Sequence, residues 1–490
     1  MQLLSPEPSL SSRVVRGGLW VFGLRIVEIG LGIIKLIILA RLLAPDDFGL
    51  FGIALLAIST LETFSQTGFQ TALIQKKGDV AGYLDTAWTV SAIRGIILFI
   101  ILLISAPYVT VFFKSPEASL IIQAIGVTIL FRGFTNIGII YFQKELKFNR
   151  QSIYGLVNGL VEFIVVVTAA LILKDVWALV IGQIAVGLVS LVVSYLIHPY
   201  RPSIHLDLKK SKELFGFGRW VFGSSILAFL LTQGDDIFVG KMLGITALGF
   251  YQMAYRISNM PATEITHVIS QVTFPAYSKM QDDLPRLREA YLRVLQLTAF
   301  LSFPIAGLIF ILGPDFTKIF LGEKWMPMVP AMQVLVFGGL VRSIAATSGY
   351  IFYAVGKPKI DTALQIVRLS VLAVLIYPFT IQLGILGTSI AVFLSIFISC
   401  IGFSFASIKI TKCGVKKFAK MIILPLINVS IAVLLILELK TLMNIGIWGF
   451  VTLTCTGTLS YIIITYLLDK FFNYGVQLLI KESIQSLRSA

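Results

Sequence analysis

Long apolar runs alternate with short polar connections along almost the whole chain. A helix needs about 20 apolar residues to cross the hydrocarbon core of a bilayer, and the sequence contains about fourteen such runs. Because the runs lack the apolar–polar alternation of strands, and because backbone groups in lipid must bond within their own segment, we expect α-helices. The runs cover residues 17–40, 48–74, 86–113, 118–142, 153–173, 176–197, 217–243, 248–275, 290–313, 328–354, 360–381, 384–406, 418–437 and 444–468.

The basic residues of the connections predict which way the spans face. Lys and Arg accumulate in every second connection, for example at Lys76, Lys147, Lys209, Lys357 and Lys416, and are sparse in the others. Cytoplasmic loops of membrane proteins carry this excess, so we expect both termini in the cytoplasm. We expect no cleavable signal peptide, because the first apolar run is long and has no small-residue cleavage site.

A weak internal repeat predicts two lobes. The sequence Trp-Val-Phe-Gly at Trp20–Gly23 recurs at Trp220–Gly223. An even number of predicted spans separates the copies, so they share one orientation, as in transporters built from two parallel lobes. We therefore expect an all-α integral membrane protein with two pseudo-symmetric six-helix lobes and two further C-terminal helices. The lobes would be residues 1–197 and 217–406, joined by a cytoplasmic linker at 198–216 and followed by the last two spans and the tail at 407–490.

Composition favours a membrane protein and argues against other classes. Hydrophobic residues make up 57% of the chain and charged residues 13%, whereas a soluble domain averages about 25% charged residues. The formal net charge of +15 is spread over short loops, without a basic patch interleaved with aromatic residues, so we expect no nucleic-acid partner. Cys400, Cys413 and Cys455 lie too far apart to suggest a metal site, and we expect no cofactor.

Ionisable residues inside the spans are costly in lipid and are usually functional. A guanidinium group pairs bidentately with phosphate or carboxylate, so arginines in the spans would bind the anionic head group of a substrate in a lumen between the lobes. The arginines that lie furthest inside predicted spans are Arg94, Arg132, Arg256, Arg342 and Arg368.

Acidic residues at membrane depth are candidates for coupling to an ion gradient. Glu62, Asp235 and Asp236 lie in predicted spans of both lobes, and their protonation would couple proton entry to transport. Further polar residues on the same helix faces are secondary candidates for the lumen. These are Arg25, Glu28, Lys35, Gln66, Asn136, Glu162, Glu264 and His267.

Each of these assignments has a structural alternative, which the sequence leaves open. Arg25 lies near a cytoplasmic end, where its head group can extend to the interface, and Glu28 can form an ion pair with it. Asp235 and Asp236 can instead cap a broken helix beside Gly234. His267 can equally be a structural, hydrogen-bonded histidine.

Three segments of the N-terminal region resemble polysaccharide flippases of the Wzx type. They are Arg16–Trp20 (Arg-Gly-Gly-Leu-Trp), Ala40–Leu50 (Ala-Arg-Leu-Leu-Ala-Pro-Asp-Asp-Phe-Gly-Leu) and Gly68–Gln75 (Gly-Phe-Gln-Thr-Ala-Leu-Ile-Gln). The resemblance extends over the chain and is nearest to the branch of colanic acid and teichuronic acid exporters. That branch belongs to the multidrug/oligosaccharidyl-lipid/polysaccharide exporter superfamily. The resemblance implies twelve or fourteen spans in two lobes, a fold like that of multidrug MATE transporters.

The resemblance also implies a transporter and not an enzyme. Its substrate would be an oligosaccharide repeat unit linked to undecaprenyl diphosphate, moved from the cytoplasmic to the outer leaflet of the bacterial plasma (inner) membrane by alternating access. The implied partners are this lipid-linked substrate, H⁺ or Na⁺ as the coupling ion, membrane lipids and the polysaccharide polymerase machinery. The polymer itself, whether O antigen, exopolysaccharide or teichuronic acid, is left open.

Two related functions remain as alternatives. A peptidoglycan-precursor flippase would share the fourteen spans and a cationic cavity, although the opening motif favours the Wzx type. A multidrug extruder of the same superfamily should have an acidic or apolar lumen, against which the arginines argue. A glycosyltransferase or polymerase would need a large extramembrane region, and no Walker, GxSxG or HExxH motif occurs.

Overall fold

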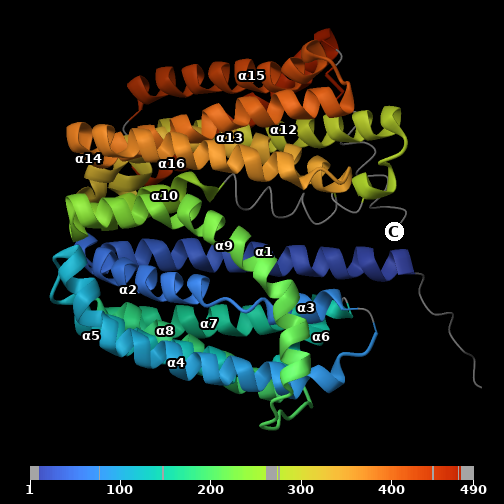
Figure 1. Cartoon of the computed structure of the whole chain (residues 1–490). Coiled ribbons are helices and arrows are strands. Elements are labelled where there is room, and N and C mark those ends of the chain that lie inside the picture. Colours follow the sequence, from blue (N-terminus) through green and yellow to red (C-terminus); the bar gives the residue numbers. More distant parts are fainter. Residues whose placement is uncertain are drawn as a thin grey trace, which may run out of the picture. The chain divides into compact units, whose positions relative to one another are not determined.

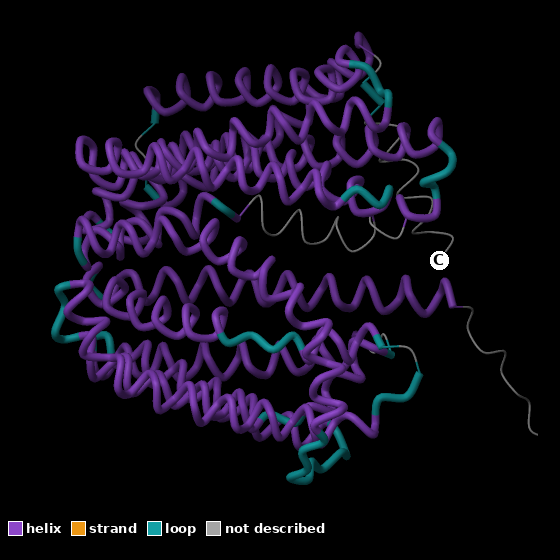
Figure 2. Tube along the Cα trace, in the orientation of Figure 1, coloured by secondary structure: helices purple, strands orange, loops and turns teal. Residues whose placement is uncertain are grey.

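The computed structural model describes residues 10–76, 78–145, 148–260, 273, 276–443, 446–472 and 474–475. This part of the chain contains no strand, and its long helices are joined by short loops (Figure 1 and Figure 2). Nine helices among these residues are long and apolar enough to cross a membrane. The prediction of an all-α membrane protein is confirmed, whereas the count of fourteen spans stays a prediction.

The chain divides into two compact units, the first ending at Gly249 and the second beginning at Phe250. The first unit contains the predicted linker 198–216 and the whole of the seventh predicted span, 217–243. The assignment of six spans to each of two lobes stays a prediction. The helices of the first unit are α1 (Leu10–Leu42), α2 (Pro45–Phe64), α3 (Phe69–Gln75), α4 (Ala81–Phe113), α5 (Ala118–Phe134), the 3₁₀ turn η1 (Ile137–Ile139), α6 (Ile140–Lys144), α7 (Phe148–Leu173), α8 (Trp177–Ile197) and α9 (Leu208–Leu243).

The second unit holds most of α10, which begins just before the division, and the later helices. The element α14 covers two predicted spans and consists of two helices that meet at a kink at Gly384, where φ is 60°. Glycine tolerates this left-handed value without a Cβ clash. The helices are α10 (Ile245–Ser258), α12 (Leu284–Phe316), the π turn η3 (Thr317–Leu321), the 3₁₀ turn η4 (Glu323–Met328), α13 (Val329–Ala354), α14 (Pro358–Thr411), α15 (Val415–Leu442) and α16 (Ile447–Phe472).

Two runs that hydropathy predicts as continuous spans are broken in the structure. The run 48–74 ends as a helix at Phe64 and resumes at Phe69, because Gly68 takes a φ of 69° between them. The run 118–142 ends at Phe134, where the Asn136 side chain accepts a hydrogen bond from the Gly138 N–H and begins a 3₁₀ turn. Gly and Asn both favour such interruptions. Apolar residues continue on both sides, so the hydropathy pattern alone does not show the breaks.

Helices α4 and α5 approach each other closely through glycines. A Cβ atom added to Gly95 would lie only 3.1 Å from the Cα atom of Gly133. Small residues allow such backbone contact between membrane helices. Since Arg94 and Arg132 directly precede these glycines, the contact brings two of the predicted arginines to neighbouring positions on the two helices.

The predicted linker lies against α4. Backbone N–H groups at alternate positions donate to side chains in the first turns of α4, which fixes the chain between α8 and α9 in place. The pairs are Ser203 with Asp85 at 2.9 Å, His205 with Thr89 at 3.1 Å and Asp207 with Thr86 at 3.2 Å. The Asp207 side chain then caps α9 by accepting from the N–H groups of Lys209 and Lys210.

Candidate substrate-binding cavities

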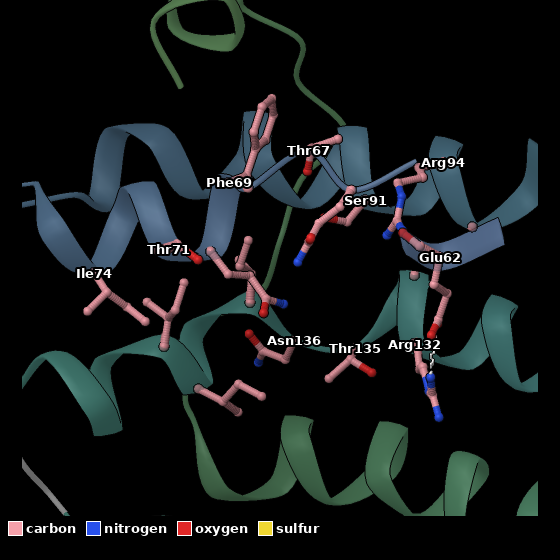
Figure 3. A pocket seen from close by; sticks show the side chains of 18 of the residues that line it. Glu62, Thr67, Phe69, Thr71, Ile74, Ser91, Arg94, Arg132, Thr135 and Asn136 are labelled. Carbon is pink, nitrogen blue, oxygen red and sulfur yellow. Dashed lines mark hydrogen bonds and ion pairs between the residues drawn. The ribbon is translucent and has the colours of Figure 1, made fainter. Parts of the chain in front are cut away.

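The first unit contains a polar cavity of about 590 Å³, here called cavity 1. Its walls come from α2, α3, α4, α5, α6 and α7 and from the two helix breaks described above. Glu62, Arg94 and Arg132 lie at one end, and Thr71 and Ile74 lie at the other (Figure 3). The breaks therefore place polar backbone and side chains inside a bundle that the apolar pattern predicts to be membrane-spanning.

Glu62 and Arg132 form an ion pair at one end of cavity 1. Nη1 of Arg132 lies 2.9 Å from Oε1 and 2.8 Å from Oε2 of Glu62, as the dashed lines in Figure 3 show. The side chains are 28% exposed for Glu62 and 53% for Arg132. The sequence assigns these residues to different roles, coupling and substrate binding, but in the structure they neutralise each other.

Arg94 holds the broken end of α2. Its Nε donates to the Ser65 carbonyl and its Nη2 to the Glu62 carbonyl, each at 2.9 Å, and both nitrogens also reach the Ser65 hydroxyl. The last carbonyl groups of a helix have no partner within the helix, and a cationic side chain there also complements the helix dipole. Arg94 lines cavity 1, but these two nitrogens face α2.

Four exposed, uncharged side chains add open hydrogen-bonding groups to cavity 1. Gln66, Gln70, Thr71 and Gln151 are exposed in its wall, and within the described part of the chain their side chains make no hydrogen bond. Sequence reasoning selected Gln66 but missed the other three. Gln70 and Thr71 follow the break at Gly68, which the hydropathy pattern does not show, and Gln151 lies on α7 just before the predicted span 153–173. Asn136 also lines the wall, but its side chain already has partners. Its Oδ1 accepts a hydrogen bond from the Gly138 N–H, and its Nδ2 donates to the Tyr200 carbonyl.

Helix α3 is tied to the start of α9 beside cavity 1. Lys76, just after α3, and the Tyr83 hydroxyl both donate to the Glu213 carboxylate, Tyr83 at 2.9 Å. These two hydrogen bonds lower the pKa of Glu213 below its usual value. Nearby, the Ala81 N–H and the Tyr141 hydroxyl lower the pKa of Asp79. These contacts hold α3, and with it Gln70 and Thr71, at the cavity wall.

A second cavity in the first unit, of about 340 Å³, is lined by other candidates from α1 and α7. Glu28, Lys35 and Glu162 all lie in its wall, and the Lys35 ammonium is 2.5 Å from the Glu162 carboxylate. The structure therefore brings together residues that the sequence places on separate spans. The Arg25 side chain, Glu264 and His267 lie outside the described residues.

The second unit contains a cavity of about 260 Å³, here called cavity 2, between α13 and α14. Both Arg342 and Arg368 line it, together with Asp361, which the sequence analysis did not select. Nη1 of Arg342 donates to Oδ1 of Asn259 at 3.1 Å, and its guanidinium lies 5.5 Å from the centre of the Tyr255 ring. Asp361 accepts a 3.1 Å hydrogen bond from the Tyr353 hydroxyl.

The remaining primary candidates lie away from these cavities. Asp235 is buried in α9, Asp236 beside it is half-buried, and Arg256 is exposed on α10. Within the part of the chain that the structure describes, none of the three lines the cavities above.

Comparisons with known proteins agree with this architecture. A family model described as "Polysaccharide biosynthesis protein" matches residues 38–330, more than half of the chain. The chain is 26% identical over 363 residues to the lipopolysaccharide biosynthesis protein WzxC of Escherichia coli (strain K12), which covers 73% of each protein. It is also 26% identical over 353 residues to the teichuronic acid biosynthesis protein TuaB of Bacillus subtilis (strain 168), covering 71% of this chain and 73% of that protein.

Solved structures show the same fold at low sequence identity. The inward closed conformation of the lipid II flippase MurJ superposes with a TM-score of 0.73 and 16% identity, covering 92% of this chain and 99% of that one. An inward-facing multidrug resistance MATE family transporter superposes with a TM-score of 0.59 and 17% identity, covering 79% of this chain and 95% of that one. The MATE-like fold is confirmed, and the expectation of a transporter and not an enzyme agrees with these relatives.

Proposed function

The chain belongs to the polysaccharide biosynthesis protein family, and from this membership we propose that it flips a lipid-linked oligosaccharide across the plasma membrane. The substrate is a repeat unit on an isoprenoid diphosphate such as undecaprenyl diphosphate, and the direction is from the cytoplasmic to the outer leaflet. Both termini are cytoplasmic, and the flipped unit is handed to the polymerase machinery of a surface polysaccharide.

The observation that carries this proposal is the pair of polar cavities inside units of apolar helices. A diphosphate-sugar head group cannot enter hydrocarbon unaided, because removing its hydration without replacement is costly. Cavity 1 offers amides and hydroxyls, and cavity 2 offers the guanidinium groups of Arg342 and Arg368. Such groups replace water around the head group while the isoprenoid tail remains in lipid.

Cavity 2 is the proposed site for the diphosphate. Arginine donates paired hydrogen bonds that match phosphate oxygens, and two arginines line this small cavity. Tyr350 lies in the same wall and offers a further hydroxyl donor, whereas the Tyr353 hydroxyl already donates to Asp361. Arg256 remains a proposed lumen residue, which would bind the anionic head group at a place outside this cavity.

Ion coupling is proposed to act through Glu62. Protonation of its carboxylate removes the charge that holds Arg132, which releases a guanidinium within cavity 1. Asp235 and Asp236 remain proposed coupling groups on α9. An alternating-access cycle driven by H⁺ or Na⁺ then links the state of this ion pair to the movement of the substrate.

The experiment that tests the function is depletion of the protein in its own cells. Lipid-linked saccharides are extracted and identified by mass, and their leaflet is determined by access to a membrane-impermeant glycan-modifying reagent. We expect a completed repeat unit to accumulate on the cytoplasmic side while surface polymer is lost. Accumulation of a peptidoglycan precursor would instead establish the rival flippase. Normal intermediates with new sensitivity to cationic dyes would establish a drug extruder.

A further inference from the structure

We propose that cavity 1 binds an uncharged, hydroxyl-rich part of the substrate, a sugar unit, and not its diphosphate. The inference rests on the proposed function and deepens it by assigning a chemical class to one of the two cavities. It reverses the expectation that the arginines of the first unit bind the anionic group. The reason lies in which polar atoms of cavity 1 already have partners.

The charged side chains of cavity 1 are engaged with the protein itself. Nη1 of Arg132 has both Glu62 carboxylate oxygens within 2.9 Å. An incoming phosphate would have to displace this carboxylate, which cannot diffuse away because it belongs to the same chain. Arg94 uses Nε and Nη2 to hold the end of α2. Arg94 and Arg132 are therefore positioning residues that shape the cavity.

Apart from Nη2 and Nε of Arg132 and Nη1 of Arg94, the groups left open are amides and hydroxyls. Gln66, Gln70 and Gln151 each present one acceptor oxygen and an NH₂ donor, and the Thr71 hydroxyl also donates and accepts. A sugar hydroxyl has the same dual character, so it can use both halves of an amide. An ionised diphosphate presents only acceptor oxygens, which leaves each amide oxygen facing negative charge. The set of open groups thus fits sugar hydroxyls better than phosphate.

The size of the cavity agrees with this ligand. Its volume of about 590 Å³ lies within the range of roughly 300–1,000 Å³ that is usual for small-molecule sites. Cavity 2, with about 260 Å³, is the smaller of the two. The larger cavity, in which Arg132 is paired with Glu62, lies in the first unit.

The test measures binding of two separate probes to the purified full-length protein. The first is the repeat-unit oligosaccharide released by mild acid from the lipid-linked pool of depleted cells, and the second is inorganic pyrophosphate. Affinities are measured by calorimetry for the wild type and for Gln70→Ala/Gln151→Ala. Since one hydrogen bond changes an affinity by about fivefold, we expect the double variant to bind oligosaccharide at least about tenfold more weakly. Pyrophosphate binding should change less than about twofold.

A matched control is Gln75→Ala, because Gln75 is an exposed glutamine on the same helix as Gln70 and does not line cavity 1. It should bind both probes like the wild type. Loss of pyrophosphate binding in Gln70→Ala/Gln151→Ala, unchanged oligosaccharide binding in that variant, or no oligosaccharide binding by the wild type would each overturn the inference. Such failure is distinct from failure of the proposed function, which shows earlier as the absence of a repeat-unit pool in depleted cells.

Discussion

Cavity 1 and cavity 2 contain the same charged groups, two arginines and one carboxylate, yet their geometry differs. In cavity 1 the carboxylate of Glu62 binds Arg132 directly. In cavity 2 the carboxylate of Asp361 accepts from Tyr353, and Arg342 donates to the neutral amide of Asn259. Counting charges therefore makes the two sites look equal, whereas the partners of each charge predict different ligands.

The largest expected effect is the loss of anion binding from cavity 2. Replacing both arginines, as Arg342→Gln/Arg368→Gln, should weaken pyrophosphate binding by about 100-fold or more, because a hydrogen bond from a charged group contributes about 1.5–3 kcal/mol. Calorimetry with the purified protein measures it. Arg286→Gln, at an exposed arginine of the same unit, is the control. Equal pyrophosphate affinity in the double variant and the wild type would abolish the proposed distinction between the cavities.

The Glu62–Arg132 pair should show direct coupling in a mutant cycle. Arg132→Glu and Glu62→Arg each place like charges together and should reduce surface polymer, whereas the exchanged double variant should restore part of it. Neighbouring partners couple by about 1 kcal/mol, a factor of about five. Surface polymer is measured per folded protein in the membrane. If the two single effects simply add in the double variant, the pair does not act as one unit.

Arg94 should affect stability more than ligand binding. Arg94→Gln removes two hydrogen bonds to the end of α2 and should lower the free energy of unfolding by about 1–3 kcal/mol. Thermal unfolding of the detergent-solubilised protein measures this loss. Arg94→Lys keeps the positive charge but cannot donate from two nitrogens to the Ser65 and Glu62 carbonyl groups. It should therefore retain only part of the stability that Arg94→Gln loses. A variant with unchanged stability but lost pyrophosphate binding would show that Arg94 is an anion ligand after all.

The smallest effect should come from Glu213, which holds α3 at the edge of cavity 1. Hydrogen bonds from Lys76 and Tyr83 lower the pKa of Glu213 in the folded protein. The stabilisation is therefore present above the unfolded-state pKa and is lost as pH falls through the lower, folded-state pKa. The melting temperature of the wild type should exceed that of Glu213→Gln near pH 7, and the two should converge in acid. A difference that grows on acidification would contradict this assignment.

Hydropathy located most of the helices of the described chain because each long apolar run carries its own signal. It failed at Gly68 and Asn136, where one residue with special turn preferences interrupts an otherwise apolar segment. Both breaks shape cavity 1, because Gln66, Gln70 and Thr71 flank the break at Gly68 and line the wall, and the break at Asn136 lines it too. Arg94, Arg132, Arg342 and Arg368 line the two cavities, whereas the prediction that they bind the anionic head group in a lumen between the lobes stays a prediction.

The linear pattern alone establishes an all-α membrane protein of the polysaccharide-exporter type, because hydrophobicity and short motifs belong to single residues and their neighbours along the chain. Which charged groups contact one another was decided only by the tertiary structure. Glu62 and Arg132 are 70 positions apart and lie on different helices, and Arg94 reaches a helix end about 30 positions away. Long side chains find such partners only once helix packing has set the distances, so the chemistry of the two cavities is a property of the fold.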